Sequence, residues 1–96
     1  REALALIAAA VADAGYALGG DVLLALDCAA SEYYKDDQYR MDGEGRSMAS
    51  EDNAAFLAEL AADYPIASIE DGMAEDDMAG WTALTERLGR RVQLVG

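Results

Sequence analysis

Two apolar segments of this 96-residue chain each end in a carboxylate. The segment 22–26 runs into Asp27, and the segment 66–69 runs into Glu70. Buried parallel strands are rich in Val, Ile and Leu, and α/β proteins bind their ligands at the carboxyl ends of such strands. Both acids are therefore expected at the end of a parallel sheet where chemistry takes place.

The chemistry that two such acids favour is the binding of a divalent cation. Adjacent strands lie about 4.8 Å apart, so ionised carboxylates at neighbouring strand ends repel each other unless a proton or a cation lies between them. Hard oxygen ligands favour magnesium, manganese or calcium over zinc, and the chain contains no histidine. A purely structural role stays open for Asp27, because strand-end aspartates commonly cap turns.

Other polar and aromatic residues near these acids have simpler structural explanations. Side chains alternate along a strand, which predicts that Asp71 points away from Glu70 and serves as a cap or in an ion pair. Tyr33, Tyr34 and Tyr39 are not accompanied by a basic groove. They are therefore expected to pack beneath a loop rather than to stack on nucleotide bases.

The elements that must position the acids follow from the spacing of apolar residues, caps and breakers. The polar stretch 31–49 is expected to be a long loop that can carry a short hairpin. The acidic turn 75–77 is expected to cap the helix that follows it. The expected elements are an amphipathic helix over 2–14 with Leu4, Ile7, Val11 and Ala14 on one stripe, a strand over 22–27, a helix from its N-cap Ser50 to Pro65, a strand over 66–70, a helix with Met78, Trp81, Leu84 and Leu88 facing inward, and a strand over 92–95.

This order, α-β-loop-α-β-α-β, predicts an α/β fold with a parallel sheet and right-handed crossovers. Three parallel strands cannot close a barrel, and they leave two edges that proteins normally pair or cover. The chain also begins without Met inside a helical pattern and stops where a strand tip is expected. Residues 1–96 are therefore expected to form a slice of one larger domain.

The composition excludes several classes of partner. With a net charge of -12 and only seven Lys and Arg residues, the chain lacks the basic clusters that bind nucleic acid or an anionic membrane surface. No segment approaches the roughly 18 apolar residues of a membrane span. Cys28 is the only cysteine, which favours a reducing compartment and a role as a small buried apolar side chain. The sequence thus predicts a soluble, cytoplasmic protein.

Three segments resemble the enolase family in order along the chain. The segment 26–34 (LDCAASEYY) and the segment 64–72 (YPIASIEDG) resemble the parts of enolases that carry two successive metal-binding acids. The segment 92–96 (VQLVG) resembles the strand that leads to the third acid. The similarity extends over all 96 residues.

The resemblance implies a partial slice of an enolase-type (β/α) barrel, with Asp27 and Glu70 as Mg²⁺ ligands and Glu70 also near the substrate. It implies a parent lyase of glycolysis, a cytoplasmic homo-oligomer that interconverts 2-phosphoglycerate and phosphoenolpyruvate. The third ligand, which follows the position of Gly96, and the family's catalytic lysine and glutamate lie outside the matching stretch. Lys35, the only lysine, is not a candidate for that base, so no catalytic residue is assigned and the chain alone is expected to be inactive.

Three alternatives stay open beside this interpretation. The main one is a stand-alone acidic α/β module that binds cations or a protein partner without catalysis. A phospho-acceptor receiver domain also gathers acids around magnesium, but it would need paired acids after its first strand and a distal lysine, and neither occurs. Another member of the enolase superfamily, such as a sugar-acid dehydratase, fits the metal spacing, although the two dense motifs favour enolase.

Overall fold

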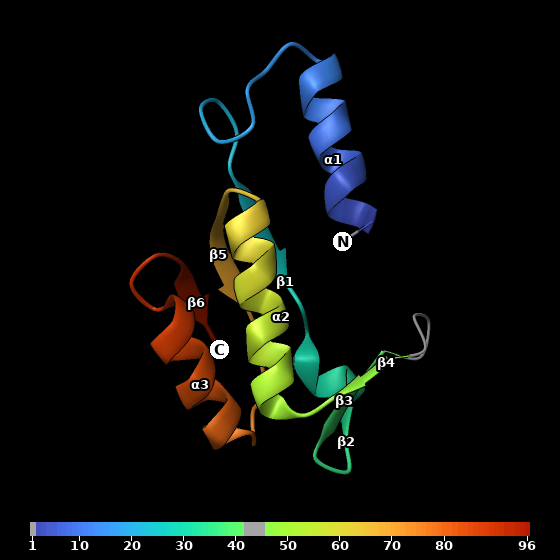
Figure 1. Ribbon diagram of the computed structural model, residues 1–96, viewed down its shortest axis with the longest axis vertical. Coiled ribbons are helices and arrows are strands. Elements are labelled where there is room, and N and C mark those ends of the chain that lie inside the picture. Colours follow the sequence, from blue (N-terminus) through green and yellow to red (C-terminus); the bar gives the residue numbers. More distant parts are fainter. Residues whose placement is uncertain (1, 42–45) are drawn as a thin grey trace.

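A parallel sheet of three strands lies at the centre of the molecule, with helices on one side and a small antiparallel sheet at one end (Figure 1). The computed structural model describes residues 2–41 and 46–96. Its elements are α1 (Glu2–Asp13), β1 (Leu24–Asp27), the 3-10 helix η1 (Ala30–Tyr33), β2 (Tyr34–Lys35), β3 (Gln38–Met41), β4 (Arg46–Met48), α2 (Ser50–Asp63), β5 (Ile66–Glu70), α3 (Met78–Leu88) and β6 (Gln93–Val95).

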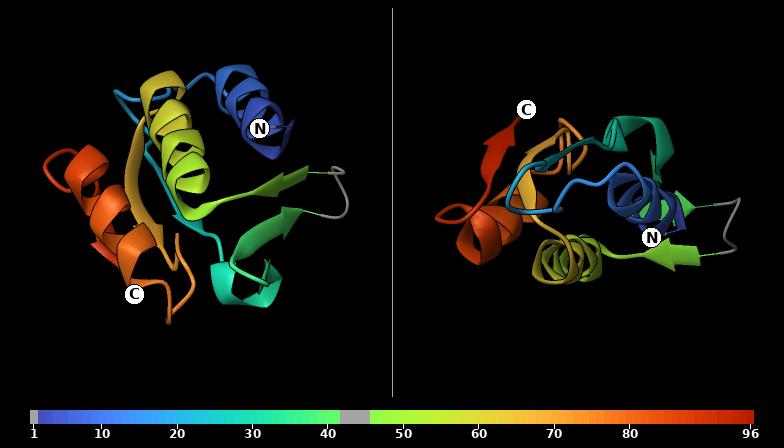
Figure 2. Two further views of the ribbon diagram at one scale, coloured as in Figure 1. Left: turned by 60° about the horizontal axis from the view of Figure 1, so that its bottom comes forward. Right: turned by 90° about the horizontal axis from the view of Figure 1, so that it is seen from above.

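The parallel sheet has the strand order β1-β5-β6. Helices α2 and α3 pack against each other and cover one of its faces (Figure 2). On that face Leu26 pairs with Ile69, and Ile69 pairs with Leu94. All three side chains belong to the apolar core or pack against it. The predicted α/β class and the parallel pairing are confirmed.

The core lies between the sheet and the two helices. Leu57 of α2 and Leu84 and Leu88 of α3 are at most 3% exposed. The predicted inward face of the third helix is thus confirmed for Leu84 and Leu88, and Trp81 is partly buried against the same core. The prediction was wrong for Met78, which is 70% exposed. Met78 is the first residue of α3, and its side chain lies on the wall of a surface cavity rather than over the sheet.

Helix α1 stands apart from the layer formed by α2 and α3 (Figure 1). Of its predicted apolar stripe only Leu4 is buried, whereas Ile7 is 45% exposed and Ala14 is also exposed. The period of the helix was predicted correctly, but a period alone does not state what covers the stripe. In the parts of the chain that the structure describes, no helix combines the length and the apolar character needed to cross a membrane.

The stretch predicted as a loop with a short hairpin contains η1 and a three-stranded antiparallel sheet, β2-β3-β4. Between β2 and β3, Asp36 and Asp37 have φ angles of 53° and 61°. Two successive residues in the left-handed region are typical of the type I′ turns that join tight hairpins. The hairpin is thus confirmed and extended by a third strand, while residues 42–45 of this stretch lie outside the described residues.

Several element boundaries differ from the prediction by one or two residues; α1 ends at Asp13 and β6 begins at Gln93. Strand β1 begins at Leu24 rather than at position 22, because Val22 forms an isolated bridge with Leu18. Ser50 was predicted to be the N-cap of the second helix, which is wrong: Ala49 occupies that position, and Ser50 is the first helical residue. The hydroxyl of Ser50 is instead used in a contact with a distant carboxylate.

Candidate functional site

Asp27 and Glu70 occupy the last positions of β1 and β5 and pair in register. Register partners on adjacent parallel strands point to the same face of the sheet. Leu26 and Ile69, one residue earlier, belong to the face that α2 and α3 cover, so the two acids project from the opposite, exposed face. The structure therefore brings these two predicted site residues together at the carboxyl end of the sheet.

The Asp27 side chain affects the protonation of Glu70. A side-chain hydrogen bond with Asp27, then the charge of Asp27, and further burial and the charge of Asp71 raise the pKa of Glu70 above its usual value. Such a pair is relieved either by one shared proton or by a cation between the groups. Because both groups offer hard oxygen ligands, the donor set fits Mg²⁺ or Ca²⁺.

A complete metal shell is not formed by this pair. Among the side chains that the structure describes, no group of three or more His, Cys, Asp or Glu residues is arranged to hold a metal ion. Mg²⁺ takes six oxygen ligands and commonly keeps several waters when only one or two carboxylates bind it. Asp27 and Glu70 can therefore supply part of an octahedral shell.

Backbone hydrogen bonds continue past the strand ends and fix the frame of the pair. The Cys28 N–H donates to the Glu70 carbonyl at 2.9 Å, and the Ala30 N–H donates to the Asp71 carbonyl at 3.0 Å. The Asp71 N–H donates to the Val95 carbonyl at 2.7 Å. Backbone hydrogen bonds thus join the residues that follow Asp27 to Glu70 and Asp71, just as they join the strands β1 and β5.

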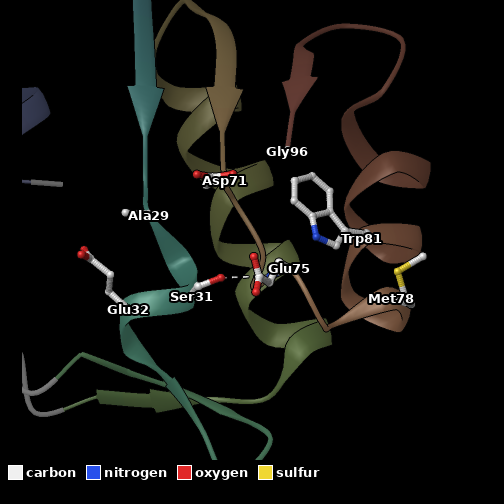
Figure 3. A pocket seen from close by; sticks show the side chains of 8 residues that line it. All are labelled: Ala29, Ser31, Glu32, Asp71, Glu75, Met78, Trp81 and Gly96. Atoms are coloured by element: carbon white, nitrogen blue, oxygen red, sulfur yellow. Dashed lines mark hydrogen bonds between the residues drawn. The ribbon is translucent and has the colours of Figure 1, made fainter.

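Asp71 leaves the extended conformation, with φ at 50°. The alternation of strand side chains that predicted its direction therefore ends at Glu70. The side chain of Asp71 lies in the wall of a cavity of about 600 Å³, together with Glu32, Glu75 and Trp81 (Figure 3). Neither Asp27 nor Glu70 is part of that wall. No sequence pattern indicates this cavity, apart from the acidic residues that follow the strand ends.

The loop that follows Glu70 is held by side chains from two other elements. The Glu75 N–H donates to Ser31 Oγ at 3.0 Å (Figure 3). Asn53, which is 1% exposed, donates from Nδ2 to the Gly72 carbonyl at 3.1 Å. A Cβ at Gly72 would lie within 3.0–3.2 Å of three core side chains, so the absence of a side chain there serves packing.

A buried carboxylate, Asp77, receives three hydrogen bonds. Tyr39 Oη donates to Oδ2 at 2.7 Å, Ser50 Oγ donates to the same oxygen at 2.5 Å, and the Gly80 N–H donates to Oδ1 at 3.0 Å. A Cβ at Gly80 would collide with Oδ2. The last of these bonds is the helix cap that the sequence predicted for the turn 75–77; the first two were not predicted, because no local pattern connects positions 39, 50 and 77.

Burial and hydrogen bonding act on Asp77 in opposite directions. Asp77 is 6% exposed, and burial alone raises its pKa. The hydrogen bonds from Ser50, Tyr39 and the Gly80 N–H favour the ionised form, and together they lower the pKa of Asp77 below its usual value. Asp77 is thus a charged group that depends on neutral donors for its stability in the interior.

The aromatic cluster and the cysteine have structural roles. The Tyr39 ring is fully buried, with its centroid 4.6 Å from that of Tyr34 and 6.0 Å from that of Tyr33, which confirms packing rather than an exposed stacking surface. Cys28 is half-buried and packs against the core. Burial, together with the charges of Asp27 and Asp71, raises the pKa of Cys28 to about 11, so its thiol stays protonated at neutral pH.

The family model that describes the enolase C-terminal TIM barrel domain matches residues 1–96. The match covers the whole chain, including both strands whose ends carry Asp27 and Glu70. The three-stranded parallel sheet with helices on one face corresponds to part of such a barrel. The chain therefore belongs to the enolase C-terminal TIM barrel domain family.

Proposed function

We propose that this chain belongs to an enolase proper, a lyase that interconverts 2-phosphoglycerate and phosphoenolpyruvate with Mg²⁺. In this proposal Asp27 and Glu70 are two of the Mg²⁺ ligands, and Glu70 also approaches the substrate. The single observation that carries the proposal is the pairing of these two carboxylates in register at the carboxyl ends of adjacent parallel strands. The family match supports it at the level of the domain.

The reaction explains why acids are needed at this place. Removal of a proton α to a carboxylate builds up negative charge on the substrate, and bound Mg²⁺ stabilises that charge. The part of this chain is to hold the ion with two oxygen ligands on a rigid sheet. Its only lysine, Lys35, lies exposed on β2. We therefore expect no turnover by these residues alone and place the general base elsewhere in the parent protein.

The proposal extends to the setting of the parent protein. As a glycolytic lyase it would act in the cytoplasm, as a homo-oligomer, on small phosphorylated acids and not on nucleic acid. The net charge of -12 supports the last point, because it opposes binding to phosphate backbones.

Calorimetric titration of the chain with Mg²⁺ tests the role of the pair. Two carboxylates should give weak binding, and Glu70→Gln or Asp27→Asn should weaken it by about tenfold or more, equivalent to about 1.4 kcal/mol. Glu86→Gln is the matched control, because Glu86 is exposed on α3. Tight binding that Glu70→Gln leaves unchanged would contradict the assignment.

The second candidate, an acidic binding module without catalysis, is favoured by the surface cavity with Glu32, Asp71 and Glu75 in its wall. The same titration separates the two candidates. If Glu32→Gln weakens cation binding and Glu70→Gln does not, the cavity binds the cation and the lyase proposal is wrong. The opposite pattern supports the lyase.

A further inference from the structure

The antiparallel sheet β2-β3-β4 lies beyond the carboxyl ends of β1 and β5 (Figure 1), and it follows β1 in the chain through η1. The loop 71–77 follows β5 and lies at the same end of the parallel sheet (Figure 3). Asp27 is thus followed by η1 and the hairpin, and Glu70 by the loop 71–77. The two segments that follow the carboxylate pair thus lie at one end of the parallel sheet.

The hydroxyl of Tyr39 joins the hairpin to the loop with two hydrogen bonds. Tyr39 Oη donates to Asp77 Oδ2 at 2.7 Å and accepts from the Ala74 N–H at 2.8 Å. Both partners belong to the loop 71–77, and the tyrosine is fully buried. Water therefore cannot replace either bond, and the central strand β3 is attached to the loop at two points.

The carboxylate of Asp77 accepts hydrogen bonds from three different elements. Besides Tyr39 on β3, it accepts hydrogen bonds from Ser50 at the start of α2 and from the backbone of Gly80 in α3. Strand β4 ends at Met48, two residues before Ser50. A buried charge that is held only by hydrogen bonds is destabilised when a donor is lost. Asp77 is thus bonded to β3 through Tyr39 and to the residue that starts α2, just after β4, through Ser50.

The other side of the loop 71–77 is attached to the residues that follow Asp27. Ser31 Oγ accepts from the Glu75 N–H at 3.0 Å, and the Asp71 carbonyl accepts from the Ala30 N–H at 3.0 Å. The loop thus lies between η1 and the hairpin and is bonded to both. The loop begins directly after Glu70, and its first residue, Asp71, is bonded to Ala30, so it connects the two strand ends to the hairpin.

We propose that Asp77 is a positioning residue for the metal pair: through its bond with Tyr39 it holds the loop 71–77 in place and thereby sets the approach of Glu70 to Asp27. The inference rests on the proposed function for the identity of the ion, Mg²⁺. Coupling between two sites is reciprocal. Mg²⁺ binding should therefore slow amide exchange in the hairpin, and loss of the Tyr39–Asp77 bond should weaken Mg²⁺ binding.

The test uses Tyr39→Phe, which removes the hydroxyl and keeps the ring, with Tyr33→Phe as the matched control from the same aromatic cluster. For each folded variant, calorimetry gives the dissociation constant for Mg²⁺, and hydrogen exchange gives the protection of the amides in 34–40 with and without Mg²⁺. We expect Tyr39→Phe to raise the dissociation constant by about fivefold or more and to abolish the protection that Mg²⁺ confers. Tyr33→Phe should change neither.

A second variant keeps the test decisive if Tyr39→Phe does not fold. Ser50→Ala removes one donor to Asp77 Oδ2 and leaves the tyrosine in place; it should weaken Mg²⁺ binding in the same direction by a smaller factor. Unchanged Mg²⁺ binding in the folded variants, with a wild-type chain that binds through Glu70, overturns the positioning role and leaves the proposed function standing. A wild-type chain that binds no Mg²⁺ overturns both.

Discussion

Asp27 and Glu70 are register partners at the ends of adjacent parallel strands, and the neighbouring Asp27 side chain raises the pKa of Glu70. The Cys28 N–H, bonded to the Glu70 carbonyl at 2.9 Å, holds the two strand ends together despite the repulsion between the side chains. The free chain therefore carries like charges at the place where it is proposed to bind a cation. Binding residues that destabilise the free protein are a common cost of function.

Glu70→Gln should raise the melting temperature of the chain by a few degrees at neutral pH in the presence of a chelator. The substitution removes one of two adjacent like charges and keeps the size of the side chain. Thermal unfolding followed by circular dichroism measures the effect, and Glu86→Gln should leave the melting temperature nearly unchanged. A lower melting temperature for Glu70→Gln would mean that the pair does not repel in the free chain.

Mg²⁺ should raise the melting temperature of the wild-type chain, because a ligand that binds only the folded state stabilises it by RT ln(1 + [L]/Kd). The rise should depend on Mg²⁺ concentration and should disappear on addition of EDTA. The Glu70→Gln chain should show little or no rise over the same range. An equal rise in both chains would place the ion elsewhere on the acidic surface.

The stability contribution of Asp77 should be lost in acid. Its pKa is lowered by folding from the ordinary value of 3.8, so the ionised group stabilises the folded state above that pH, and the contribution falls as the pH drops towards the lower pKa of the folded state. The difference in unfolding free energy between the wild-type and Asp77→Asn chains should be constant near neutrality and shrink below about pH 4.

Denaturant titration at several pH values checks this prediction, with Asp52→Asn on the exposed start of α2 as the control. The control should show a small difference in unfolding free energy at every pH. A difference for Asp77→Asn that grows on acidification would mean that the folded state favours the protonated acid. In that case burial would raise the pKa of Asp77 by more than the three hydrogen-bond donors lower it.

Two apolar residues of α3 should respond very differently to truncation. Leu84 is fully buried, and Leu84→Ala should reduce the free energy of unfolding by about 2–5 kcal/mol. Met78 is 70% exposed, and Met78→Ala should change it by no more than about 0.5 kcal/mol. Urea unfolding at low temperature measures both values. Similar losses of unfolding free energy for the two variants would contradict the difference in exposure between Leu84 and Met78.

The strands, the helices and the carboxylate pair could be predicted because each leaves a local signal. An apolar run that ends in an acid marks both β1 and β5, and the alternation of helices with strands implies a parallel sheet, which places both acids at one end. The register that joins Asp27 to Glu70 was not predicted, and it includes an irregularity between Leu24 and Ala25. The metal role of the pair remains a prediction.

What could not be predicted depends on contacts between distant residues. A short hairpin was expected in the stretch 31–49, but the pairing of β4 with β3 was not. Met78 has the correct helical spacing for the core. The first residue of α3 nevertheless lies at the wall of a cavity, which periodicity does not reveal. The bonds of Asp77 to Tyr39 and Ser50 span 38 and 27 positions, and no pattern along the chain relates such residues.

Gly80 leaves the room that the Asp77 carboxylate occupies, since a methyl group there would collide with Oδ2. Substitution tables treat glycine to alanine as one of the mildest exchanges, and helix propensity would rank it as a gain within α3. In this molecule the same exchange would displace a buried anion from its three donors. A Gly80→Ala variant should therefore be interpreted as a change that disrupts the hydrogen bonds of Asp77, although the added methyl group is itself uncharged.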